Sequence, residues 1–172
     1  MNRFLLIVLI LLGLDGGVQA GEKSEIFSIY LVRHAEKETE PSDPGNPLLS
    51  RCGELRAEAI AEMLSDIRLE KIYSTEFERT LETARPSAES HQLEIERYDP
   101  TELGEFSRLL IDRRQGALVI GHSNTTGVLA GLLAGESGEE FAEEEYDRLY
   151  QVVVSGDHNE VYLLHQAFRC DS

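Results

Sequence analysis

Two arginines and two histidines lie in three short polar clusters, and each cluster follows an apolar stretch of the chain. The clusters are residues 33–37 (Arg-His-Ala-Glu-Lys), 74–80 (Ser-Thr-Glu-Phe-Glu-Arg-Thr) and 121–124 (Gly-His-Ser-Asn). A guanidinium offers a planar fork of donors that matches the oxygens of a phosphate dianion. The clusters therefore predict a pocket for a phosphorylated ligand, built around Arg33, His34, Arg79 and His122.

A metal site is the competing interpretation of the two histidines, because histidine is the commonest metal ligand. Arg33 beside His34 argues against it, since a fixed cation repels a metal ion. No cysteine or carboxylate pair has the spacing of zinc ligands. The glycine-rich nucleotide motifs and the G-x-S-x-G elbow of serine hydrolases do not occur in the sequence. We therefore expect neither a metal nor a cofactor.

The composition indicates one globular domain with an acidic surface. The chain has 172 residues, of which 41% are hydrophobic, so it can form a buried core. Its net charge is −16. Such a surface repels polyanions, which argues against a nucleic acid as the partner. An anionic ligand must instead be bound by a local basic pocket.

The first 20 residues have the pattern of a cleavable secretory signal peptide. Arg3 precedes an apolar run over residues 4–14, and Val18-Gln19-Ala20 forms a small-residue cleavage site. Asp15 ends the run well short of the ~20 apolar residues that span a bilayer. We expect cleavage after Ala20, a domain over residues 21–172 that is periplasmic or secreted, and no stable membrane insertion.

Strands and helices alternate along the remainder of the chain. This order is typical of a three-layer α/β/α sandwich with a mostly parallel sheet, which the terminal hairpin makes mixed. The expected strands cover residues 26–32, 71–73, 93–95 and 117–120, followed by a C-terminal β-hairpin over residues 149–154 and 161–165. The expected helices cover residues 50–66, 77–91, 100–113 and 125–134, with a shorter acidic one over residues 138–145.

Two helix details are also predicted by pattern. Apolar spacing places Leu55, Ile60 and Met63 on the inward face of the first helix, with Ser50 as its N-cap. Asn124 is the expected N-cap of the helix over residues 125–134. Since parallel strands end at one edge of a sheet, the three polar clusters should meet there, next to the positive end of that helix.

The motifs resemble those of the histidine phosphatase superfamily, the phosphoglycerate mutase-like fold. Residues 31–37 are similar to its Arg-His signature, in the form found in the small bacterial Val-Arg-His-Ala-Glu-Lys branch. Residues 47–53 resemble its Pro-Leu-Ser/Thr-x-x-Gly segment, residues 73–84 its second arginine motif and residues 121–125 its second histidine motif. The motifs occur in the family's order and span nearly all of the chain after Ala20.

The resemblance implies a role for each matching residue. His34 would be the nucleophile that takes the phosphoryl group, while Arg33, Arg79 and His122 would bind the phosphoryl oxygens, with Ser123 and Asn124 beside them. A nucleophilic imidazole must be neutral, and repulsion from Arg33 should keep its pKa low.

The proton donor is where the sequence departs from the family. Many acid phosphatases of the superfamily have Asp directly after the second histidine, and here that position is Ser123. The mutase branch takes a Glu from the region between the second arginine and the second histidine. Three acidic residues in that region are candidate donors: Asp99, Glu102 and Glu105.

These observations predict a metal-independent phosphatase that hydrolyses phosphomonoesters through a phosphohistidine intermediate on His34. Two alternatives stay open, a phosphatase of phosphoproteins of the phosphohistidine type and a phosphate-binding module with little activity. The partner is thus a small phosphorylated molecule or a phosphoprotein. Cys52 and Cys170 are the only cysteines, and an oxidising compartment would permit a disulfide between them.

Overall fold

The computed structural model describes residues 26–156 and 158–170, which form six strands and four helices. The expected signal peptide, residues 1–20, lies outside the described residues. The strands are β1 (Phe27–Arg33), β2 (Lys71–Ser74), β3 (Ile95–Arg97), β4 (Ala117–Gly121), β5 (Arg148–Ser155) and β6 (His158–His165). The helices are α1 (Arg51–Met63), α2 (Glu78–His91), α3 (Leu103–Arg113) and α4 (Thr126–Ala134).

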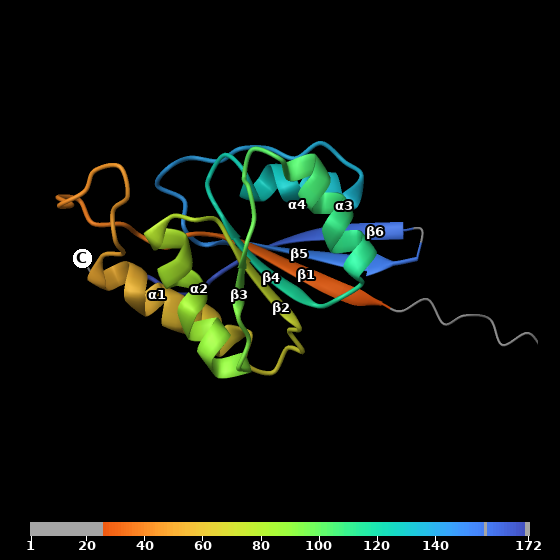
Figure 1. The fold of residues 1–172 in the computed structure, drawn as a ribbon, viewed down its shortest axis with the longest axis horizontal. Coiled ribbons are helices and arrows are strands. Elements are labelled where there is room, and N and C mark those ends of the chain that lie inside the picture. The colour runs from red at the N-terminus through yellow and green to blue at the C-terminus, as the bar shows by residue number, and fades with distance from the viewer. Residues whose placement is uncertain (1–25, 157, 171–172) are drawn as a thin grey trace, which may run out of the picture.

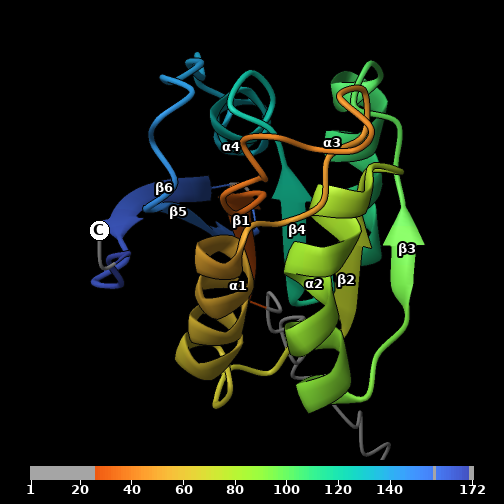
Figure 2. The ribbon, with the colours of Figure 1, turned by 90° about the vertical axis from the view of Figure 1, so that its left-hand side faces the viewer.

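The strands form one mixed sheet in the order β3-β2-β4-β1-β5-β6. Strands β1 to β4 are mutually parallel, and β5 runs antiparallel to β1, with β6 completing a hairpin. Figures 1 and 2 show α1 and α2 on one face of this sheet and α3 and α4 on the other. The predicted three-layer α/β/α sandwich with a C-terminal hairpin is confirmed.

The alternation of side chains along β1 explains why both faces are covered. Ile29 and Leu31 pack with α3 and α4, in a core that includes Phe106 and Leu133. Tyr30 and Val32, which point to the opposite face, pack with α1 and α2 in a second core. A strand that is apolar on both sides needs a helical layer on each face. Within the described residues, no helix is long and apolar enough to cross a membrane.

Helix α1 begins as predicted, but its buried face is different. The Ser50 side chain accepts a hydrogen bond from the Gly53 amide, as an N-cap should. Leu55 and Met63 were expected inside and are exposed, whereas Arg56 is buried. Arg56 tolerates burial because its guanidinium makes a bidentate ion pair with Glu36, with Nη2–Oε1 at 2.6 Å. The apolar spacing could not reveal this partner, which comes from the loop after β1.

Two further helix predictions are corrected. The segment over residues 138–145 forms a loop rather than a short helix. The N-cap of α4 is Thr125 rather than Asn124, and the Thr125 hydroxyl accepts a hydrogen bond from the His122 amide at 2.9 Å. That bond ties the start of α4 to the end of β4.

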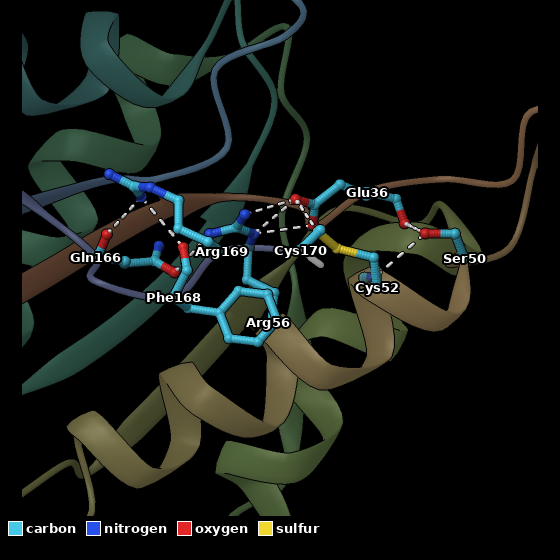
Figure 3. The surroundings of a disulfide bond; sticks show 9 residues. Glu36, Ser50, Cys52, Arg56, Gln166, Phe168, Arg169 and Cys170 are labelled. Atoms are coloured by element: carbon cyan, nitrogen blue, oxygen red, sulfur yellow. Dashed lines mark hydrogen bonds and ion pairs between the residues drawn. A yellow bond between two sulfur atoms is a disulfide. The ribbon is translucent and has the colours of Figure 1, made fainter. Parts of the chain in front are cut away.

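The C-terminal tail packs against the start of α1 (Figure 3). Cys52 and Cys170 form a disulfide, and their Cα atoms lie 5.7 Å apart, within the range that the bond requires. Phe168 lies against the Arg56 guanidinium, and Gln166 is fully buried. A bridge between residues 118 positions apart stabilises a fold by about 4–5 kcal/mol in the chain-entropy model. The disulfide thus fixes the tail beside the Glu36–Arg56 pair.

Candidate active site

The carboxyl ends of β1, β2 and β4 bring the three polar clusters together at one edge of the sheet. Arg33 ends β1 and His34 follows it, while His122 follows β4, the strand that pairs with β1. Arg79 lies in the first turn of α2, after β2. A cleft of about 320 Å³ opens between them, and His34, Arg79, His122, Ser123 and Asn124 line it.

His34 is buried and its tautomer is determined by one hydrogen bond. Its Nδ1 lies 2.8 Å from the carbonyl oxygen of Ala35. A carbonyl only accepts, so Nδ1 carries the hydrogen and Nε2 keeps its lone pair. Nε2 is thus the nucleophilic atom of the ring.

Burial and nearby positive charge keep His34 neutral. Its pKa is lowered to about 3, chiefly by burial; the hydrogen bond to the Ala35 carbonyl, the next-largest effect, raises it, and the charges of Arg33, His122 and Arg79 lower it further. Repulsion from Arg33, the cause expected from the sequence, is therefore real but second to desolvation. At neutral pH the ring has the form that nucleophilic attack requires.

A chain of hydroxyl groups orients the second histidine. The Thr80 hydroxyl donates to the Phe77 carbonyl at 2.7 Å, so its oxygen is free to accept from Thr75, 2.8 Å away. The Thr75 oxygen then accepts from Nε2–H of His122 at 3.1 Å. The His122 pKa is lowered to about 4 by burial and by the two arginines, and its ring centroid lies 5.4 Å from that of His34.

Both arginines carry a buried donor without a partner among the described residues, and of the two only Arg79 lines the cleft, while Arg33 lies buried behind it. In the described part of the chain, neither buried Nε–H group has a hydrogen-bond partner. The Arg79 side chain makes no hydrogen bond to any described residue and lies against the Phe77 ring at 4.4 Å. Burial and the Arg33 charge lower its pKa. Buried donors without acceptors are costly, so these groups call for an anionic ligand.

Arg33 is held from behind by the loop that connects α4 to β5. Its Nη1 donates to the Glu143 carbonyl at 2.6 Å, its Nη2 to the Glu143 carboxylate at 2.9 Å, and the Tyr146 ring lies 4.3 Å from the guanidinium carbon. Gly127 of α4 permits the close packing of this loop, because a Cβ there would lie 2.2 Å from the Glu139 carbonyl. The loop thus fixes the orientation of Arg33.

The three carboxylates proposed as proton donors lie elsewhere. Asp99 is exposed and accepts hydrogen bonds from Thr101, while Glu102 is the N-cap of α3 and Glu105 lies in its first turn. None of the three lines the cleft, although Thr101 does. The acidic residue that the structure places there is Glu143, which motif reasoning missed. No motif marks this residue, because it reaches the cleft only through the antiparallel pairing of β5 with β1, which returns the preceding segment to this edge of the sheet.

The site and the fold identify the class of protein. The sequence profile of the histidine phosphatase superfamily (branch 1) matches residues 29–143. The chain therefore belongs to the histidine phosphatase superfamily, and its site supports a phosphatase function. No curated protein sequence matches the chain significantly.

Solved structures with the same fold include several phosphatases. The protein histidine phosphatase SixA, complexed with tungstate, is 17% identical with a TM-score of 0.66, covering 81% of this chain and 97% of that one. The alpha-ribazole phosphatase of Shigella flexneri is 15% identical with a TM-score of 0.63, covering 85% and 100%. A mycobacterial glucosyl-3-phosphoglycerate phosphatase with inorganic phosphate is 13% identical with a TM-score of 0.59, covering 80% and 95%. At these identities the likeness concerns the fold.

The lowered pKa values predict that both site histidines are neutral at pH 5. The unfolded chain binds a proton on each ring below about pH 6.5, whereas the folded protein does so only near pH 3 for His34 and pH 4 for His122. Stability should therefore fall as the pH falls through this window. An NMR titration of the imidazole carbons, assigned with the His34→Ala and His122→Ala variants, measures the pKa of each ring. A midpoint near 6.5 for either ring would contradict the buried, positively charged site.

Proposed function

We propose that the protein is an exported phosphatase that hydrolyses phosphomonoesters through a phosphohistidine intermediate on His34, without a metal. The observation that carries the proposal is a pair of buried guanidinium Nε–H groups that have no partner among the described residues, on two arginines whose charges act on the neutral His34 ring. Phosphoryl transfer depends mainly on positioning and on neutralising the charge of the phosphoryl oxygens. Two arginines supply that charge.

The reaction has two steps at this site. Nε2 of His34 attacks phosphorus, the N–P bond forms and the P–O bond to the leaving group breaks. Water then attacks the phosphohistidine, which releases inorganic phosphate and regenerates the neutral ring. Arg33, Arg79 and a protonated His122 would stabilise the transferring group, because a bound dianion raises the pKa of the nearby histidine.

A phosphoprotein phosphatase of the phosphohistidine type is the second candidate. It is favoured by the likeness in fold to the protein histidine phosphatase SixA. Two residues that line the cleft, Lys37 and Glu143, have side chains that are 43% and 64% exposed, so a macromolecular substrate could contact them from outside.

The test is turnover of a chromogenic aryl phosphate in the presence of EDTA. Hydrolysis should persist in EDTA because the arginines replace a metal, and it should begin with a burst because the phosphohistidine accumulates in the first turnover. Loss of activity that added zinc restores would overturn metal independence. Binding of inorganic phosphate with no turnover of aryl phosphates or phosphohistidine peptides would favour a binding module instead.

Export is part of the proposal and rests on the pattern of residues 1–20 together with the Cys52–Cys170 pair. The Cα atoms of the two cysteines lie 5.7 Å apart, which permits a disulfide, and disulfides persist in oxidising compartments. Intact mass of the non-reduced protein, isolated from the exported fraction, should show loss of residues 1–20 and no alkylatable thiol. A full-length protein with two reactive thiols would contradict it.

A further inference from the structure

Glu143 supplies the one carboxylate among the described residues that line the cleft. It comes from the loop that connects α4 to β5 and is fixed at its backbone, where its carbonyl accepts from Arg33. Its side chain is 64% exposed and lines the cleft. The position combines an anchored main chain with a solvent-exposed carboxylate.

The Glu143 carboxylate reaches the residue that follows the second histidine. Its Oε1 accepts from the Ser123 hydroxyl at 2.7 Å, and its Oε2 accepts from Arg33 at 2.9 Å, with Lys37 Nζ at 3.9 Å. Position 123, directly after His122, is a serine, so the residue next to the second histidine supplies a hydroxyl and no acid. A carboxylate from a different segment therefore lies at this place in the cleft.

We propose that Glu143 is the proton donor to the leaving group, which makes the enzyme competent on esters of poorly acidic alcohols and phenols. This inference rests on the proposed phosphatase function. It also assigns a substrate class, since a leaving group that departs as a stable anion needs no such donor.

The proton balance closes over the two steps. As the N–P bond to His34 forms, the P–O bond of the ester breaks, and the leaving oxygen takes the proton of the Glu143 carboxylic acid. The Glu143 carboxylate then takes a proton from the water that attacks the phosphohistidine. The N–P bond breaks, phosphate leaves, and the acid form of Glu143 is restored for the next substrate.

Substrate binding provides the reason for Glu143 to be protonated. In the free cleft its pKa is lowered, first by the Ser123 hydroxyl and then by Arg33 and Lys37, so the group is ionised. A phosphoryl dianion would replace this carboxylate as the partner of Arg33 and add two negative charges beside it. Both changes raise the pKa of a carboxyl group. Glu143, which is ionised and paired with Arg33 in the free site, thus takes up a proton when the ester binds and can then donate it.

The experiment compares Glu143→Gln with the wild type on two aryl phosphates. Phenyl phosphate releases phenol, a weak acid with a pKa of about 10, like tyrosine. 2,4-Dinitrophenyl phosphate releases a far more acidic phenol that needs no proton. We expect kcat/KM for phenyl phosphate to fall about 10²-fold or more, as for loss of a general acid, while kcat/KM for the dinitrophenyl ester changes little. The second ester also reports that the variant is folded.

The neighbouring Glu144, which is exposed, provides the matched control. Glu144→Gln should leave both rates unchanged. An equal loss on both esters in Glu143→Gln would overturn the inference, because a residue that only holds Arg33 in place acts regardless of the leaving group. If the wild-type protein hydrolyses neither ester nor a phosphohistidine peptide, the phosphatase proposal itself fails.

Discussion

Replacing His34 by alanine is expected to reduce phosphatase turnover by about 10⁴-fold or more, because a covalent mechanism loses its first step with its nucleophile. The Ala35 carbonyl positions this ring so that Nε2 faces the reacting group, and burial keeps it neutral. No other histidine takes this place, since His122 uses its Nε2 on Thr75. Steady-state hydrolysis of an aryl phosphate measures the loss.

Trapping of the intermediate makes the test specific. Wild-type protein mixed with labelled substrate and quenched should carry a phosphate that is labile in acid and stable in alkali, and the His34→Ala variant should carry none. His158→Ala is the matched control, since that exposed histidine lies on β6 outside the cleft lining. Turnover of His34→Ala near the wild-type level, or label on serine or aspartate, would refute the assigned nucleophile.

Replacing Arg79 by lysine should lower kcat/KM by about 10²–10³-fold, the range found when one preorganised donor to transition-state charge is removed. Lysine keeps the charge and loses the planar fork, and its ammonium cannot reproduce the Nε–H donor that the structure leaves without a partner. The loss should appear for every phosphorylated substrate, because the group binds the phosphoryl oxygens rather than the leaving group. An equal loss of kcat/KM for all substrates distinguishes Arg79→Lys from Glu143→Gln, whose loss depends on the leaving group.

Arg85→Lys is the control for this substitution. Arg85 lies on the same helix, α2, and is exposed, so its replacement should not change kcat/KM. Thermal unfolding of both variants shows whether the fold is kept. A loss of only a few-fold in Arg79→Lys would mean that Arg79 does not contact the transferring group.

Much of the fold follows from local patterns in the sequence. The apolar run before Arg33 and the run before Gly121 each predict a buried strand, and both strands lie at the centre of the sheet. The strand expected over residues 93–95 is present as the edge strand β3, shifted to Ile95–Arg97. These patterns succeed because a short, continuous apolar run between polar segments predicts a strand that is buried on both faces, and that information lies within a few residues.

Patterns failed where burial depends on a partner far along the chain. Helical spacing favoured Leu55 and Met63 over Arg56 as inward residues, since an isolated guanidinium is costly to bury. Glu36, from the loop after β1, removes that cost by ion pairing. The closeness of Cys52 to Cys170 likewise depends on where the tail crosses α1 after β6, which no local periodicity encodes.

The candidate site likewise contains residues that local sequence predicted and one residue that only the tertiary structure placed there. The sequence by itself determined that Arg33, His34, Arg79 and His122 meet, because each follows a strand and parallel strands end at one edge of a sheet. Only the tertiary structure decided which carboxylate joins them. Asp99, Glu102 and Glu105 lie within the expected region, yet the chain leads them along β3 and α3, away from the cleft lining. Glu143 reaches the cleft because β5 pairs antiparallel with β1, which returns the preceding loop to the edge where His34 and His122 lie.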